Sequence, residues 1–268
     1  MMKIKTLTRL RTLVFAVLIC AAPATASAWG MLGHRIVGEV ASSYLQPKAR
    51  KAIIAFMGHE SLAMSANWAD FIKSDTSFNY LNNWHYVNLP ADLNQAGIYS
   101  VLKADKGPNV YTKIPEMIRQ LKDPRSTAEQ KRFALRLLVH LIGDVHQPMH
   151  TARKEDLGGN RVNVTWFGQR SNLHRVWDEQ LIDYQQLSYT EYARAINAPS
   201  AAQLTSWRKT GLEEWVWESY QVCNRIYSMT PPDSKLSYRY NFDFVESLNT
   251  QLLKGGIRLA QVLNEIYA

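Results

Sequence analysis

The chain has 268 residues, of which 46% are hydrophobic and 20% are charged, and it carries a formal net charge of +8 with only two cysteines. This composition predicts one domain with a substantial core and excludes a fold held together by several disulfide bonds. The basic excess is compatible with a polyanionic partner without identifying one, and no feature indicates an obligate protein partner.

The first 28 residues are typical of a secretory signal. The basic start MMKIKTLTRLR precedes the apolar run LVFAVLICAA, which is too short to span a bilayer. Residues 26–28 (Ala-Ser-Ala) have the small-x-small form of a cleavage site. A lipoprotein signal acylated at Cys20 is the alternative, and the large Ile19 before it disfavours that alternative.

Cleavage after Ala28 would make Trp29 the first mature residue. It would remove four basic residues and no acid, so the net charge would fall from +8 to +4, and it would leave Cys223 as the remaining cysteine. We therefore expect an exported protein, periplasmic or secreted, with one domain over residues 29–268 and no membrane span.

Residues 29–45 open the mature chain with a helical pattern that starts at His34, and a second helix is expected over residues 47–57. His34 lies near the start of the first helix, and Gly30 and Gly33 allow a close backbone approach before it. A free Trp29 amine and carbonyl could chelate a metal with His34 close by. The alternative is an ordinary buried tryptophan and a surface histidine.

The next hundred residues hold two further candidate ligands. Asp70, in SANWADFIKSD, could face inward, and His85 lies in an aromatic segment, residues 79–90, that is expected to be extended. Tyr86 beside it could belong to the core or stack on a planar ligand. Residues 91–114 are expected to be irregular, and residues 114–122 to form a short helix.

The central stretch HLIGDVHQPMH, residues 140–150, has the densest set of candidate ligands. A capping box at residues 126–130 predicts the start of its helix, on which His140 and Asp144 would share one face. Pro148 would break the helix and let His150 turn back toward the same point. The pattern predicts a metal site, and the alternative is an amphipathic helix with a core histidine.

A hairpin and further helices complete the chain. Val162, Val164 and Trp166 alternate before Gly168, which predicts the hairpin. His174 and Asp178 follow at a helical i,i+4 spacing and form another ligand pair, or else a surface His–Asp pair. The remaining residues have helical periodicity and are expected to be scaffold.

The candidate ligands are too many for one tetrahedral zinc ion and indicate a cluster with shared carboxylates. Their nitrogen and oxygen donors, without cysteine, are typical of catalytic zinc. His59 and His146 have no ligand-like neighbours and are left out. The candidates are Trp29, His34, Asp70, His85, His140, Asp144, His150, His174 and Asp178.

Taken in order, the motifs WGxxGH, NWAD, WHYVN, HxxGDxHQPxH, GGN and NLHxxWD resemble the single-strand-specific zinc nucleases of the S1/P1 family. The resemblance covers nearly the whole mature chain. It implies a mainly α, single-domain multi-helix fold of the phospholipase C/P1 nuclease type, with a small β-hairpin. The missing disulfides and the compact signal indicate a bacterial, exported homologue.

The resemblance also implies three zinc ions and their ligand sets. One zinc would bind Asp70, His85, His140 and Asp144. A second would bind His150, His174 and Asp178. The third would bind the amine and carbonyl of Trp29, with His34 and Asp144, so that Asp144 bridges two ions.

The activity implied is hydrolysis of phosphodiester bonds in single-stranded DNA and RNA to 5′-phosphorylated products, by a zinc-activated hydroxide that Asp70 orients. Removal of 3′-phosphates from nucleotides is implied as well. Tyr86 matches a base-stacking position. Lys73 stands where fungal members carry a phosphate-binding arginine, and Asn88 where they carry a base-reading aspartate.

Two other functions remain as alternatives. A zinc-dependent phospholipase C has a similar site, but with a longer gap between its tryptophan and first histidine and a glutamate in place of Asp178. A non-enzymatic metal-binding protein would need a closed site, whereas these ligands leave positions open for water.

Overall fold

The computed structural model describes residues 29–268, so the predicted signal at 1–28 lies outside the described residues. The long helices are α1 (Met31–Tyr44), α2 (Pro47–Met57), α5 (Gln95–Ala104), α6 (Val110–Lys122), α7 (Ala128–Val145), α10 (Tyr189–Ile196), α11 (Ala201–Arg208), α12 (Leu212–Met229) and α13 (Tyr238–Ile266). The short helical segments are α3 (Leu62–Ser65), α4 (Trp68–Phe71), η1 (Ile72–Ser74), η2 (Thr76–His85), η3 (Pro148–Thr151), α8 (Leu173–Arg175), η4 (Val176–Gln180) and α9 (Leu181–Asp183). The prediction of a mainly α fold is confirmed.

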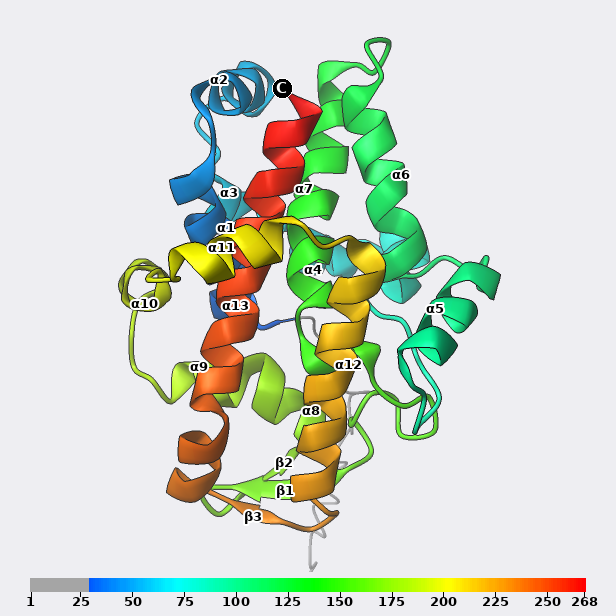
Figure 1. Cartoon of the computed structure of the whole chain (residues 1–268), viewed down its shortest axis with the longest axis vertical. Helices are drawn as coiled ribbons and strands as arrows, with labels where there is room; N and C mark the ends of the chain where they lie inside the picture. The colour runs from blue at the N-terminus through cyan, green and yellow to red at the C-terminus, as the bar shows by residue number, and fades with distance from the viewer. Residues whose placement is uncertain (1–28) are drawn as a thin grey trace, which may run out of the picture.

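Helix α7 lies at the centre of the molecule. Helices α6, α13 and α1 pack around it, and α12 crosses its C-terminal end (Figure 1). Its last nine residues, 137–145, are all buried, which matches the almost unbroken apolar run around its two ligands. The predicted capping box is confirmed, because the Thr127 hydroxyl accepts from the Gln130 amide and the Gln130 side chain accepts from the Thr127 amide.

Helix α1 packs directly against α13 through a close contact of small residues. A Cβ atom on Gly256 would lie 2.4 Å from Val40 Cγ1, so only glycine lets the two helices approach this far. The contact places the N-terminal helix, with His34 on it, against the same core that encloses α7.

The predicted hairpin is confirmed as β1 (Asn163–Trp166) and β2 (Gln169–Asn172), paired antiparallel. Its turn residues Phe167 and Gly168 both have positive φ, as a tight primed turn requires. A third strand, β3 (Lys235–Leu236), pairs parallel to β1 and was not predicted.

Two segments differ from the sequence expectation. Residues 91–114, expected to be irregular, hold α5 and the start of α6, because the Asn94 and Asn109 side chains cap these helices. Residues 79–90, expected to be extended, are 3₁₀-helical as far as His85 and extended only beyond it, and the Asp75 side chain caps that helical segment. Among the described residues, no helix is long and apolar enough to cross a bilayer.

Candidate metal centre

Eight of the predicted ligands converge from seven helical elements of the fold. All are buried except Asp70, whose side chain is 15% exposed. They are His34 on α1, Asp70 on α4, His85 at the end of η2, His140 and Asp144 on α7, His150 on η3, and His174 and Asp178 on α8 and η4. The fold thus assembles the whole histidine and aspartate set in one place.

The Asp144 carboxylate lies at the centre of the set and contacts four histidines. Its Oδ1 atom lies 3.4 Å from His34 Nε2 and 3.4 Å from His150 Nδ1. Its Oδ2 atom lies 3.0 Å from His85 Nδ1 and 3.1 Å from His140 Nε2. The two oxygens therefore face different ligand groups, which is the arrangement of a bridging carboxylate.

The donor atoms fall into three groups, each compact enough to hold one metal ion. The groups are His34, Asp70 and His140; His85, His140 and Asp144; and His150, His174 and Asp178. The third is the set expected from the sequence. The first joins His34 to Asp70 and His140, whereas the sequence expectation paired His34 with Trp29 and Asp144.

Backbone carbonyls fix the orientation of three imidazole rings. The Nδ1 atoms of His140, His150 and His174 lie 2.7, 2.8 and 2.6 Å from the carbonyl oxygens of Ala66, His85 and Gly158. An Nδ1–H that donates to a carbonyl leaves Nε2 deprotonated and available as a metal ligand. All three Nε2 atoms are thus prepared for coordination.

The unpartnered polar atoms of the site fit bound metal. Both ring nitrogens of His34, the Nε2 atoms of His85 and His150, and Asp144 Oδ1 are buried and have no hydrogen-bond partner. Buried polar groups without partners are costly, and a cation that these atoms coordinate would remove that cost. Nitrogen and carboxylate donors without sulfur suit zinc or a similar divalent ion.

The protonation states of the histidines favour metal binding. Burial lowers the pKa of His34 to about 4 and that of His150 to about 3, and it also lowers the pKa of His85. These rings are therefore neutral at pH 7, as ligands must be. His140 differs, because the charges of Asp144 and Asp70 outweigh the effect of burial and raise its pKa.

The aspartates are affected in opposite directions. Burial would raise the pKa of Asp70, but His140 and Lys73 outweigh it and lower the pKa to about 2. Lys73 Nζ lies 2.6 Å from Asp70 Oδ1. For Asp178, burial dominates over the neighbouring His174 and raises the pKa to about 6.

Trp29 lies against the metal-binding residues. Its side chain is fully buried, and its indole Nε1 donates to the Gly143 carbonyl at 2.8 Å. The next amide, of Gly30, donates to the Asp178 carbonyl at 2.8 Å. The first residue after the predicted cleavage site is thus fixed between two ligand-bearing segments.

A cavity of about 200 Å³ opens beside the third metal group. It is lined by Tyr86, Asn88, Met149, Leu157, Gly158, Asn160 and His174. Both residues expected to contact a base, Tyr86 and Asn88, therefore lie in one cavity with a predicted metal ligand. Asn160 and Leu157 were not predicted, although Asn160 belongs to the GGN motif.

Sequence reasoning missed Gln147, which supports a ligand, and the buried position of His146. The side-chain nitrogen of Gln147 donates to Asp178 Oδ1, and its side-chain oxygen accepts from the backbone amide of Met149 at 2.5 Å. The Gln147 side chain thus orients the Asp178 carboxylate. His146, which had been left out, is fully buried behind α7, where its Nδ1 lies 2.7 Å from the Ile142 carbonyl and its Nε2 lies 3.0 Å from the Arg258 guanidinium.

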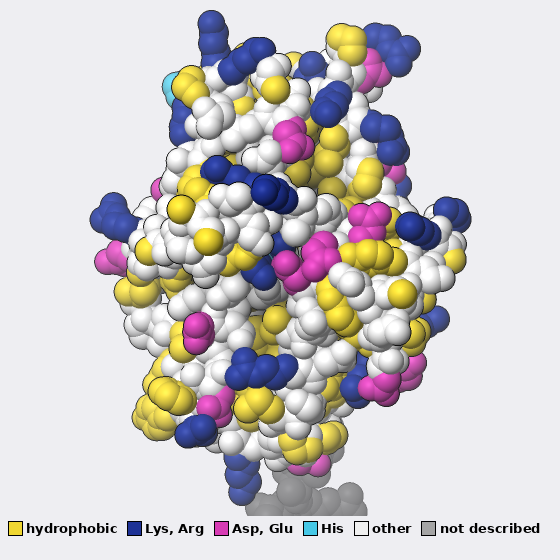
Figure 2. Space-filling model, viewed as in Figure 1, with side chains coloured by type: hydrophobic (Ala, Val, Ile, Leu, Met, Phe, Trp, Pro, Cys, Tyr) yellow, Lys and Arg dark blue, Asp and Glu magenta, His cyan; other side chains and the backbone are white. Residues whose placement is uncertain are grey.

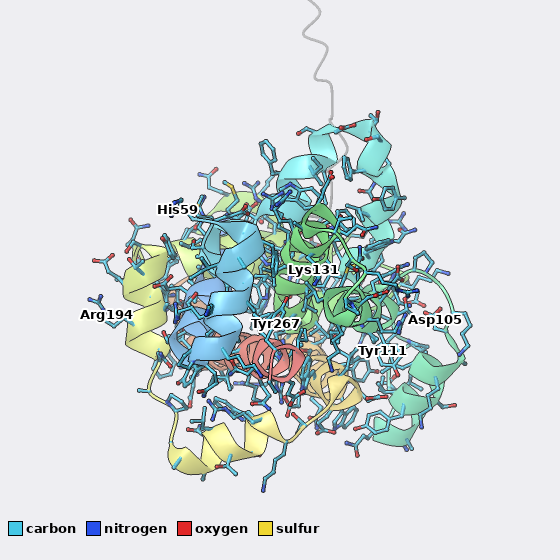
Figure 3. All side chains as sticks on the ribbon, turned by 90° about the horizontal axis from the view of Figure 1, so that it is seen from above. His59, Asp105, Tyr111, Lys131, Arg194 and Tyr267 are labelled. Atoms are coloured by element: carbon cyan, nitrogen blue, oxygen red, sulfur yellow. The ribbon has the colours of Figure 1, made fainter. Side chains whose placement is uncertain are left out.

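His59 was also left out of the ligand set, and the structure places it away from that set. It is exposed after the end of α2, and Figure 3 shows it at the periphery of the molecule.

Basic side chains on the face of the molecule seen in Figure 2 are spread out, with acidic side chains between them, and do not form one patch. The chemistry is therefore concentrated at the buried centre.

Comparisons with known proteins match most of the chain. The S1/P1 nuclease family model matches residues 29–268. The chain is 30% identical to Endonuclease 3 of Arabidopsis thaliana over 270 residues, covering 90% of this chain and 89% of that protein. It is 30% identical to Nuclease P1 of Penicillium citrinum over 268 residues (89% and 98%) and 29% identical to Nuclease S1 of Aspergillus oryzae over 168 residues (57% and 54%).

Proposed function

The chain belongs to the S1/P1 nuclease family and is a hydrolase of that type, and from this premise we propose that it is a zinc-dependent endonuclease of single-stranded DNA and RNA. The products would carry 5′-phosphates. The proposal rests on the position of Asp144: the two oxygens of its carboxylate face four histidines and so connect the ligand groups. Three zinc ions per chain are proposed, one for each group.

Zinc bound here would act as a Lewis acid and would lower the pKa of a coordinated water to about 7. The residues around it have two tasks. Asp70, ionised and partly exposed, accepts a hydrogen bond from the attacking water and orients it toward phosphorus. Lys73 holds Asp70 in place and contributes a positive charge beside the phosphodiester, which gains negative charge in the transition state.

Single-strand preference follows from the cavity at Tyr86. A base can enter it only after leaving a base-paired stack, and it would then stack on Tyr86 and contact the Asn88 amide. We also propose removal of the phosphate from nucleoside 3′-phosphates. Such a nucleotide has only the base that precedes the phosphate, so this preceding base is the one assigned to Tyr86.

Export with cleavage after Ala28 is part of the proposal. Two observations support it: the family match begins at residue 29, and Trp29 is buried against Gly143 beside the ligands. A free amine on Trp29 would add a nitrogen donor close to His34. The protein would then be periplasmic or secreted.

The proposed function is tested with purified protein that starts at Trp29. Single-stranded DNA and RNA are digested with and without a chelator, and the termini of the products are identified. Chelator-sensitive release of 5′-phosphorylated products, restored by zinc, is expected. Absence of cleavage with zinc bound, together with hydrolysis of phosphatidylcholine, would replace the nuclease with a phospholipase C.

A further inference from the structure

A second cavity, of about 390 Å³, meets the metal centre on the side of Asp70. We call it the Phe71 groove. It is lined by Met31, Arg35, Glu60, Met64, Asn67, Trp68, Asp70 and Phe71. It shares no lining residue with the cavity at Tyr86. The two cavities therefore contact the ligand set through different members, His174 in one and Asp70 in the other.

The Phe71 groove exposes large apolar side chains. Phe71 is 75% exposed, Met31 64% and Met64 51%, and all three line the same cavity. Single exposed apolar residues are ordinary, but several around one hollow beside a reactive centre are typical of a binding site. Phe71 and Asp70 line the same groove, so a ligand stacked on the Phe71 ring would lie in one cavity with the Asp70 carboxylate.

The groove also has charge suited to an anion. The one other acid in it, Glu60, is neutralised by Arg136, whose Nε and terminal nitrogen lie 3.0 and 2.6 Å from its two oxygens. Asp70 is paired with Lys73. Among the described residues, no carboxylate forms an ion pair with Arg35, whose Nε lies 2.8 Å from the terminal amide group of the Asn67 side chain.

We propose that the Phe71 groove binds the nucleotide that follows the scissile phosphate, the one that keeps the 5′-phosphate in the product. Its base stacks on Phe71, and Arg35 attracts its backbone. The proposal rests on the proposed function: the preceding base occupies the cavity at Tyr86, so the strand leaves the centre past Asp70. An aromatic ring and a cation are the usual elements of sequence-independent single-strand binding.

The test uses two dinucleoside monophosphates, each with a single cleavable bond. Both have thymine before the phosphate; one has thymine after it and the other has an abasic sugar. Values of kcat and KM are measured for wild type and for Phe71→Ala. Phe242→Ala is the matched control, because Phe242 is 73% exposed and lies on α13, outside the groove.

Wild type should have the lower KM for the dinucleotide with two bases. Phe71→Ala should raise that KM on the order of tenfold, as loss of one base–aromatic stack predicts, and should leave the abasic substrate unchanged. Phe242→Ala should change neither. Equal KM values for both substrates in wild type, or an equal effect of Phe71→Ala on both, would overturn the proposal while leaving the nuclease intact. Cleavage of neither substrate by wild type would overturn the proposed function and the groove with it.

Arg35 is tested by the salt dependence of binding. Affinity of the chelated, inactive protein for a short oligothymidylate is measured across a range of salt concentrations. Arg35→Gln should weaken binding and lessen its salt dependence, because one phosphate contact is lost. An unchanged salt dependence would exclude Arg35 from the groove's function.

Discussion

The ring of His34 fits against Gly143 with no room for a side chain between them. A Cβ atom on Gly143 would lie 2.8 Å from His34 Nδ1, and the His34 ring stacks on the His140 ring with their centroids 3.8 Å apart. The glycine between the two ligands of α7 therefore sets the position of a third ligand on another helix.

Gly143→Ala should displace the His34 ring. We expect loss of about one zinc per chain and at least a tenfold lower kcat, although alanine favours a helix over glycine by about 1 kcal/mol. Zinc content and kcat are measured together. Gly211→Ala, where a Cβ would meet nothing closer than 3.7 Å, is the control. Full zinc content in Gly143→Ala would show that the His34 ring can move aside and still bind metal, and would contradict the prediction.

Asp144→Asn should remove more than one metal, because the aspartate faces all three ligand groups through His34, His85, His140 and His150. We expect a fall in kcat of roughly a thousandfold, comparable to the loss of a major transition-state contact. Zinc stoichiometry is measured by elemental analysis, with the exposed Asp183→Asn as control. Retained stoichiometry and rate would rule out the bridging role.

An extra alanine before Trp29 should weaken one metal site. Trp29 is fully buried with its indole bound to Gly143, and an added residue would convert its free amine into a peptide nitrogen, which is not a metal ligand. We expect lower zinc content and lower activity. An alanine added after the exposed Ala268 is the control. Equal activity of the two extended proteins would count against a terminal ligand.

The stability of the chelated protein should fall as pH rises from about 4 to 6. Burial raises the pKa of Asp178 to about 6, so in that range the folded protein holds a proton that the unfolded chain releases. The stabilisation is complete below the unfolded pKa and is lost as pH rises through 6. Compared with Asp178→Asn, wild type should lose on the order of 3 kcal/mol across this range. The measurement is urea unfolding at each pH, and parallel curves for the two proteins would refute the prediction.

Arg258→Ala should destabilise the protein by about 3 kcal/mol, since it breaks a buried ion pair. Arg258 is fully buried, with its guanidinium 2.7 Å from Glu218 and 3.0 Å from His146. On the same helix, Arg239 is 81% exposed and pairs with Asp243 at 2.9 Å. Arg239→Ala should cost less than about 1 kcal/mol. Urea unfolding of both variants checks the contrast, and similar costs would contradict it.

The sequence predicted the features that depend on residues close together in the chain: the i,i+4 ligand pairs, the hairpin turn and the capping box of α7. His140 with Asp144 and His174 with Asp178 stand four residues apart, and their atoms lie 3.1 and 3.0 Å apart. The hairpin turn and the capping box of α7 were predicted for the same reason. These features depend on neighbours along the chain.

Contacts between distant segments left no comparable signal. His146 meets Arg258 across 112 residues, and nothing near His146 in the sequence indicates that partner. Residues 91–114 were expected to be irregular because of Gly97, Gly107 and Pro108, yet helix caps at Asn94 and Asn109 and burial of α5 and α6 prevail. Strand β3 is two residues long and pairs with a strand about 70 residues earlier, so it has no periodicity to detect.

The helix that carries His174 and Asp178 contains one wide turn. Residues Val176–Gln180 form π-helix, with one more residue per turn than the regular helix around them, and Asp178 lies in the middle of it. Such a turn takes up one extra residue while the helical segments on either side keep their positions, so a deletion of one residue here would restore a regular turn and change which side chain of the turn faces the other ligands. At this point a change in chain length would do more damage to the site than an exchange of most neighbouring side chains. Outside His174 and Asp178, side chains of this helix can be exchanged with the ligand positions kept, whereas a shorter chain would move Asp178 itself.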